Sequence, residues 1–158
     1  MLTKAPTEND NLRNEYAPLF SDVPKDIPFA RIALQKPPEA INFWLGNSAS
    51  TTALHKDNYE NIYVQVLGRK QFVLLPPVEA ACVNEQSLPA ATYLPRDDDA
   101  KGDDVELEVV LDEPAETVPF ATWDPDEPGE RRTKFSGLSR LARVTLEEGD
   151  MLYLPALW

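Results

Sequence analysis

Residues 51–77 of the chain read TTALHKDNYENIYVQVLGRKQFVLLPP, and this stretch has strong β-strand character. β-Branched and aromatic side chains favour strands, and they are concentrated in residues 62–67 and again in residues 70–75. The glycine and arginine at 68–69 mark a turn between the two runs, and the prolines at 76–77 end the second. The pattern predicts two strands joined as a hairpin.

The rest of the chain offers shorter elements and one long stretch without a clear pattern. Residues 76–140 hold many prolines, an acidic run and only short strand candidates, so they predict a long insertion with little regular structure. Short strands, glycine and proline turns and little helix predict a mainly β fold, either a barrel or a sandwich. Further strands are expected at residues 41–46, 105–111, 141–146 and 151–155, and helical turns around residues 14–20 and 29–34.

The composition indicates an ordinary globular domain and argues against a nucleic-acid-binding protein. The 158 residues suit one domain, with 42% hydrophobic and 27% charged residues, as in ordinary globular proteins. The net charge of -12 argues against non-specific nucleic-acid binding, which needs a basic face. Acids crowd into residues 96–104, either as a solvated loop or as a docking surface for a basic partner.

The single cysteine and the absence of long apolar runs bear on location. Cys82 is the only cysteine, so an internal disulfide is excluded, and with no histidine near it in sequence we interpret it as a packing residue. No apolar run reaches the length of a membrane span, and the first residues lack the apolar core of a signal peptide. We therefore expect a reducing compartment, cytoplasmic or nuclear.

The segment His55-Lys56-Asp57 holds the only histidine of the chain. Residues two apart on a strand point to the same face, so His55 and Asp57 can bind one metal together. Two histidines and one carboxylate form the facial triad of non-haem iron(II) oxygenases. The alternative interpretation is a surface histidine beside an acid, because His-x-Asp also arises often by chance.

The residues after Asp57 support a ligand site if the strand phase continues. Asn61, Tyr63 and Gln65 would then share a face with His55 and Asp57, and a polar inner wall suits a small polar ligand in a barrel mouth. The alternative is a half-exposed strand with this polar side in water. Lys70 on the next strand either pairs with a carboxylate of the ligand or extends into solvent beside the turn.

Several segments together resemble the small jumonji-C lysyl hydroxylases of the jumonji-domain-containing-protein-7 type. The resemblance covers nearly the whole chain from about Asn11 onward and is far more specific than His-x-Asp alone. The segments that carry it are INFWLG (41–46), TALHKDNYEN (52–61), ATY (91–93), WDP (123–125) and GDMLYLPALW (149–158).

This resemblance implies a double-stranded β-helix, a cupin-like jelly roll, that uses iron(II), 2-oxoglutarate and molecular oxygen. It implies that His55 and Asp57 are two of three iron ligands. Thr52, Asn61 and Lys70 match residues that hold 2-oxoglutarate. It also implies a protein substrate, since the group is linked to lysyl hydroxylation of GTP-binding proteins of translation. Members can form homodimers, and a peptidase activity on histone tails has been proposed for the group.

The sequence departs from the family pattern at its end. The family places its second histidine just past the motif that ends here at Trp158, and an upstream tyrosine that contacts 2-oxoglutarate has no secure counterpart. We therefore expect a lead-in at residues 1–27 and a partial cupin-like domain at residues 28–158, incomplete at its C-terminus and at best weakly active. Restoring the natural downstream sequence should restore turnover.

Two functions remain open at this point. One is a protein hydroxylase with an incomplete metal site, and the other is a non-catalytic cupin-like binding or interaction module. A peptidase finds no support, because the sequence offers neither a zinc-binding pattern nor a Ser-His or Cys-His nucleophile pair. No residue is assigned as a catalytic acid, base or nucleophile.

Overall fold

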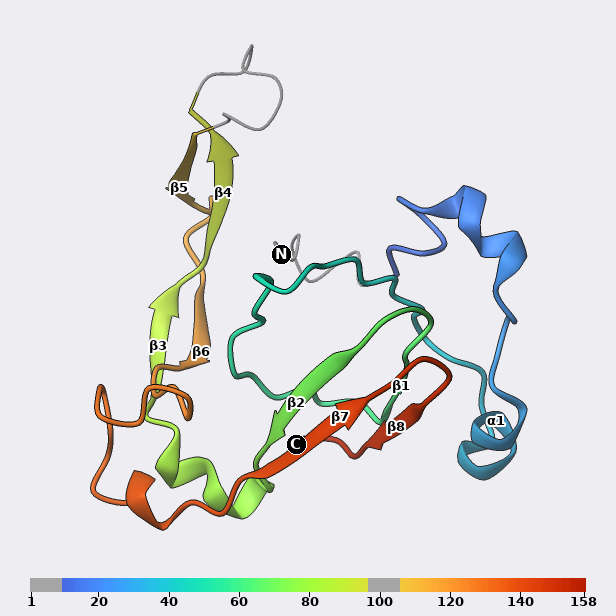
Figure 1. Cartoon of the computed structure of the whole chain (residues 1–158). Helices are drawn as coiled ribbons and strands as arrows, with labels where there is room; N and C mark the ends of the chain where they lie inside the picture. The colour runs from blue at the N-terminus through green and yellow to red at the C-terminus, as the bar shows by residue number, and fades with distance from the viewer. Residues whose placement is uncertain (1–9, 97–105) are drawn as a thin grey trace. The chain divides into compact units, whose positions relative to one another are not determined.

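The computed structural model describes residues 10–96 and 106–158, drawn as coloured ribbon in Figure 1. These residues form mainly short strands, with helical turns at η1 (Ala17–Asp22), α1 (Pro28–Leu34), η2 (Pro77–Cys82) and η3 (Ser136–Leu138). The strands are β1 (Asn61–Val64), β2 (Lys70–Leu74), β3 (Glu85–Pro89), β4 (Ala91–Pro95), β5 (Leu107–Leu111), β6 (Thr117–Ala121), β7 (Ala142–Leu146) and β8 (Met151–Leu154).

The chain divides into two compact units. Among the described residues, one unit consists of residues 10–51, 92–96 and 106–108, and the other consists of residues 52–91 and 109–158. The second unit contains β1, β2, β3, β6, β7 and β8 and every residue of the predicted ligand site. The predicted domain boundary at residue 28 stays a prediction.

The strands pair in nested order. β1 pairs with β8, β2 with β7, β3 with β6 and β4 with β5. Each of the first four strands therefore pairs with one of the last four, in reverse order. The first three pairs are antiparallel. Nested pairing of this kind is how a jelly roll is built, and it confirms the predicted mainly β, jelly-roll class.

The predicted hairpin of residues 62–75 is wrong. Both strands form, but β1 and β2 belong to separate sheets, in which they pair with β8 and β7 (Figure 1). The rings of Tyr63 and Phe72 lie edge to face with their centroids 5.0 Å apart. Each strand can bury one face this way while its backbone pairs with a distant strand, and that burial outweighs the local turn signal.

The predicted insertion is more regular than expected. Residues 76–140 include η2, β3 to β6 and η3, so the expectation of little regular structure is wrong for the described part. The base of the β3–β6 pair is fixed by Asn84, whose carbonyl accepts from the Thr122 Oγ1 at 2.8 Å and whose side chain donates to the Arg131 carbonyl at 2.8 Å. Most of the acidic run lies outside the described residues.

Elsewhere the expected elements are partly confirmed. The predicted strands at 141–146 and 151–155 are β7 and β8, and the described part of the candidate at 105–111 contains β5. Helical turns form close to the predicted places, as η1 and α1. The strand predicted at 41–46 is wrong, because Asn11 satisfies this backbone instead: Phe43 N donates to Asn11 Oδ1 at 2.6 Å.

The second unit has a small core formed by Leu75, Cys82, Trp123 and Leu146, all buried. Cys82 packs as expected, and its burial, reinforced by the negative charge of Glu79, raises the pKa of its thiol. Within the described residues, no helix has the length and apolar character that crossing a membrane requires.

Shortening Leu146 to alanine should lower the free energy of unfolding by about 2 kcal/mol, because its side chain is only 4% exposed and would leave a cavity. Urea unfolding followed by tryptophan fluorescence measures the change. Thr145→Ala is the matched control, since Thr145 is exposed on the same strand and its loss should change stability by less than about 0.5 kcal/mol. Equal losses in both variants would show that this core does not carry the stability of the unit.

Candidate functional site

His55 lies in a segment, residues 52–60, that has no regular secondary structure and leads directly into β1. Its side chain is exposed, and the ring nitrogen Nδ1 lies 2.8 Å from the Ala53 carbonyl oxygen. A carbonyl only accepts hydrogen bonds, so Nδ1 carries the proton and donates it. The lone pair of Nε2 is then available, which is the arrangement found in metal-binding histidines.

Asp57 is held mainly through its backbone. Its carbonyl accepts a hydrogen bond from the Leu157 amide at 2.7 Å, which joins the His55 segment to the chain that leaves β8. Its exposed carboxylate receives only a long contact of 3.4 Å from Asn61 Nδ2, and the same amide also donates to the Tyr59 carbonyl at 3.2 Å. The carboxylate thus keeps most of its capacity to bind a cation.

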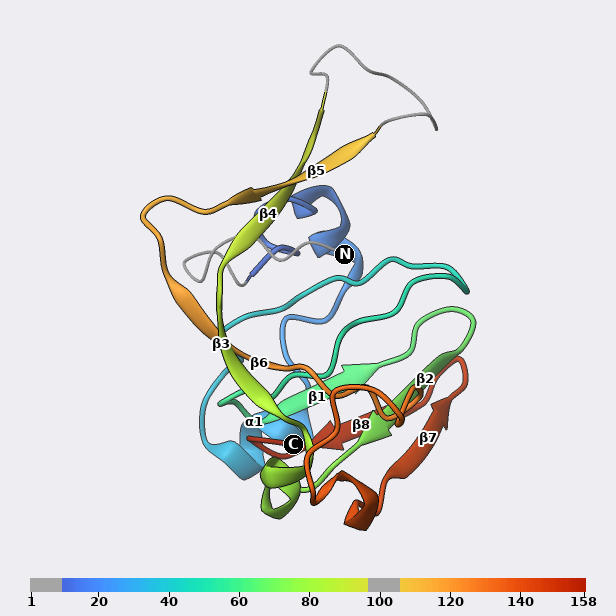
Figure 2. The same ribbon diagram turned by 90° about the vertical axis from the view of Figure 1, so that its left-hand side faces the viewer.

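Asn61 and Lys70 lie on sheet faces that look toward each other. Alternate residues of a strand share a face, so Asn61 and Tyr63 lie on one face of β1, and Lys70 and Phe72 lie on one face of β2. Because the rings of Tyr63 and Phe72 touch, the two faces form opposite walls of one interior, and Figure 2 shows the two strand pairs close together from a second side. All four side chains are partly buried.

Apolar side chains lie opposite the two polar ones across the strand pairs. Lys70 lies opposite Leu146, and Asn61 lies opposite Leu154, in the registers of their strand pairs. Leu146 is buried and Leu154 is half-buried. Gln65, only 8% exposed, continues the polar row of β1, so this row faces inward rather than into water.

The donor set fits part of an iron site. A neutral imidazole nitrogen and a carboxylate two residues apart match two positions of the facial triad. Within residues 10–96 and 106–158, no group of three His, Cys, Asp or Glu side chains could hold a metal ion. Thr52 is exposed three residues before His55, and its predicted role, like the roles of the other four residues, stays a prediction.

Tyr63 is a residue of this interior that the sequence analysis placed on the polar face without assigning it a role. It lies between the two walls, and burial raises the pKa of its phenol. A phenol with a raised pKa stays protonated, and therefore a hydrogen-bond donor, throughout the neutral range. Its position two residues after Asn61 was the signal that could have identified it.

The raised pKa of Tyr63 predicts how stability depends on pH. Because the folded state holds this proton more tightly than the unfolded state, its contribution is intact below the ordinary tyrosine pKa of about 10 and is lost as the pH rises further. An absorbance titration at 295 nm of the chain and of Tyr63→Phe should show that the variant lacks one late-titrating tyrosine. Loss of a tyrosine that titrates at its ordinary pH would contradict the burial.

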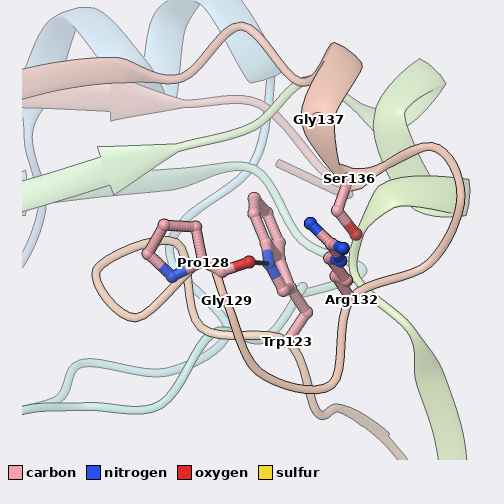
Figure 3. A pocket seen from close by; sticks show the side chains of 6 residues that line it. All are labelled: Trp123, Pro128, Gly129, Arg132, Ser136 and Gly137. Atoms are coloured by element: carbon pink, nitrogen blue, oxygen red, sulfur yellow. Dashed lines mark hydrogen bonds between the residues drawn. The ribbon is translucent and has the colours of Figure 1, made fainter.

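A pocket elsewhere in the second unit shares no residue with this site. It has a volume of about 350 Å³, and Trp123, Pro128, Gly129, Arg132, Ser136 and Gly137 line it. Figure 3 shows the indole of Trp123 between Pro128 and Arg132, and its Nε1 donates to the Pro128 carbonyl at 3.4 Å. Ser136 donates to the Cys82 carbonyl at 2.6 Å, so its hydroxyl proton is already used within the core.

Comparison with known proteins gives the family. The profile of the family described as "Cupin-like domain" matches residues 2–158. The human bifunctional peptidase and (3S)-lysyl hydroxylase JMJD7 is 38% identical over 148 residues, which cover 94% of this chain and 45% of that protein. The lysine-specific demethylase JMJ32 of Arabidopsis thaliana is 38% identical over 159 residues, 96% of this chain and 44% of that protein.

A third relative agrees with these two. The JmjC domain-containing protein E of Dictyostelium discoideum is 34% identical over 157 residues, 96% of this chain and 44% of that protein. The chain spans about half the length of the curated relatives it matches. The resemblance to jumonji-C proteins is thereby confirmed, and the chain belongs to the family of cupin-like domains.

Proposed function

We propose that the chain is the iron(II)- and 2-oxoglutarate-binding part of a protein lysyl hydroxylase. The observation that carries the proposal is the state of His55: its Nδ1 proton is committed to the Ala53 carbonyl at 2.8 Å, which leaves Nε2 free two residues from the exposed carboxylate of Asp57. The segment that holds this pair continues directly into β1, which begins at Asn61. Asn61 and Lys70 lie on strand faces that look toward each other.

Each side chain has a role that follows from its chemistry. His55 and Asp57 hold the iron, and Asp57 also supplies a negative charge that balances part of the charge of the cation. The ammonium group of Lys70, partly buried among apolar side chains, pairs with a carboxylate of 2-oxoglutarate. Asn61 and Thr52 donate hydrogen bonds to the same ligand. When bound, the iron would supply the oxidising chemistry that couples decarboxylation of 2-oxoglutarate to hydroxylation.

This proposal assigns two protein ligands to the iron and leaves the third position of the triad unassigned. The facial triad uses two histidines, and His55 is the only histidine of the chain. Water or a group outside the described residues would take the remaining position. Two protein ligands hold a metal less firmly than three, so we expect weak iron binding and little turnover by the 158 residues alone.

A lysine-bearing protein is the substrate class we propose. The human relative is named a lysyl hydroxylase and the Arabidopsis relative a lysine-specific demethylase. The charge of -12 would attract a basic segment of a partner toward this chain. GTP-binding proteins of translation are the partners that the jumonji-C resemblance favours, in a cytoplasmic or nuclear setting.

A non-catalytic binding module is the second candidate. It is favoured by the finding that the described part of the chain holds no group of three metal-binding side chains. The same finding gives no support to a zinc peptidase at this site, although the name of the human relative includes peptidase activity.

Anaerobic calorimetry separates the two candidates. The chain is titrated with iron(II), and the mixture is then titrated with 2-oxoglutarate. The hydroxylase proposal expects binding of 2-oxoglutarate that strengthens when iron(II) is present, because the two share one site. A folded chain that binds neither ligand would overturn it and leave the binding module.

A further inference from the structure

The ion pair between Lys56 and Glu85 holds the segment that carries His55 and Asp57. Lys56 Nζ lies 2.6 Å from Glu85 Oε2, and both side chains are partly exposed at 44% and 38%. Lys56 is the residue between the two proposed metal ligands, and Glu85 is the first residue of β3. The contact therefore joins the proposed metal site to a strand that contributes no ligand.

The segment needs such a support because regular structure does not provide one. Residues 52–60 belong to no strand, so they lack the ladder of hydrogen bonds that fixes residues inside a sheet. The Leu157 amide holds the segment at Asp57 from one direction. The ion pair of Lys56 holds the neighbouring residue from β3.

Glu85, at the other end of the ion pair, lies in a well-bonded part of β3. Glu85 pairs with Ala121 in the β3–β6 register. Asn84, directly before it, adopts a positive φ of 48° and is bonded on both sides, accepting from Thr122 and donating to Arg131. The backbone that carries the Glu85 carboxylate is therefore well bonded, and the ion pair ties Lys56 to it.

We propose that Lys56 and Glu85 are positioning residues that set the spacing of His55 and Asp57 for metal binding. This inference rests on the proposed function of the site. An exposed ion pair contributes little on its own, so removing it should weaken metal binding only about threefold to fivefold. Salt screens exposed charges, so the difference should vanish in about 1 M salt.

The test uses the whole chain with cobalt(II) as the probe, because its visible spectrum reports ligand geometry as well as binding. Lys56→Met and Glu85→Gln should each weaken cobalt binding and alter the spectrum, with an unchanged midpoint of thermal unfolding. Lys56→Arg and the charge-swapped double variant Lys56→Glu/Glu85→Lys should restore both. Arg143→Met is the matched control, since Arg143 makes a similar exposed ion pair with Asp126 at 2.5 Å and should leave cobalt binding unchanged.

Hydrogen exchange of the metal-free chain gives an independent readout. The single variants should speed exchange of the Leu157 amide, whose hydrogen bond to the Asp57 carbonyl holds the segment, whereas Arg143→Met should not. Cobalt binding and exchange that match the unmodified chain in both single variants would overturn the inference alone. An unmodified chain that binds no cobalt would overturn the proposed function, and the positioning role with it, even if exchange of the Leu157 amide responds as expected.

Discussion

Replacing His55 with alanine is expected to weaken iron(II) binding by at least about a hundredfold, because it removes the only imidazole of the chain. The remaining carboxylate of Asp57 is exposed and bonds only weakly within the protein, so by itself it would bind a cation little better than any surface acid. Anaerobic calorimetry with iron(II) measures the loss. The unfolding transition should not move, because the His55 side chain is exposed and packs against no core.

Two further variants make the result specific. Asp57→Asn keeps the size of the side chain and removes its charge, so it should also abolish most of the iron binding. Asn58→Ala changes an exposed neighbour and should leave the affinity unaltered. Iron affinity that survives in His55→Ala would place the metal elsewhere and remove the central support of the hydroxylase proposal.

Replacing Lys70 with methionine should lower the affinity for 2-oxoglutarate by about 30-fold or more, while iron(II) binding stays the same. The loss corresponds to at least about 2 kcal/mol, the cost of leaving one member of a desolvated charge pair without its partner. Methionine is close to lysine in length and suits a position opposite Leu146, so the fold should be preserved. Titration with 2-oxoglutarate in the presence of iron(II) measures the effect.

Arg69 provides the matched control for Lys70. It is the preceding residue, carries the same charge and makes an exposed ion pair with Glu147 at 3.4 Å. Arg69→Met removes one positive charge from the same turn but none from the interior, so it should change the affinity by less than about twofold. Equal losses in both variants would mean that Lys70 acts only through the overall charge of the turn.

The strands were largely predictable, but their partners were not. The runs that became β1, β2, β7 and β8 have the composition of strands, and this is a local property that a single sequence carries. Pairing depends on which faces can be buried together, as the contact of Tyr63 with Phe72 shows. The turn at Gly68 therefore predicted a hairpin where the chain instead passes from one sheet to another.

Two local predictions failed for related reasons. The stretch at 41–46 has strand composition, yet the side chain of Asn11, far away in sequence, bonds both backbone groups of Phe43. The prolines of residues 76–140 suggested irregular structure, but Pro89 and Pro95 lie at the ends of β3 and β4, where a missing amide is tolerated. Both cases depend on partners that no local pattern reveals.

The sequence proposes a set of candidate site residues, but it does not give their geometry. The expected alternation begins only at β1, because residues 52–60 form no strand; Asn61 and Tyr63 are partly buried and Gln65 is buried, but Ile62 on the opposite face is partly buried as well. The proton position of His55 and the contact of Lys56 with Glu85 were not readable, since each depends on how an irregular segment folds back. Their functional roles remain predictions for the experiments above.

The nested order of the strands also sets the path by which this chain can reach its structure. β1 and β8 flank residues 65–150, whereas β4 and β5 flank only residues 96–106. Closing a long loop costs more entropy than closing a short one, and each inner pair shortens the loop left for the next. Assembly is therefore expected to proceed from the inner pairs toward β1 and β8, at the slow rates typical of chains dominated by contacts between distant residues. The segment that carries His55 would then be the last to be anchored.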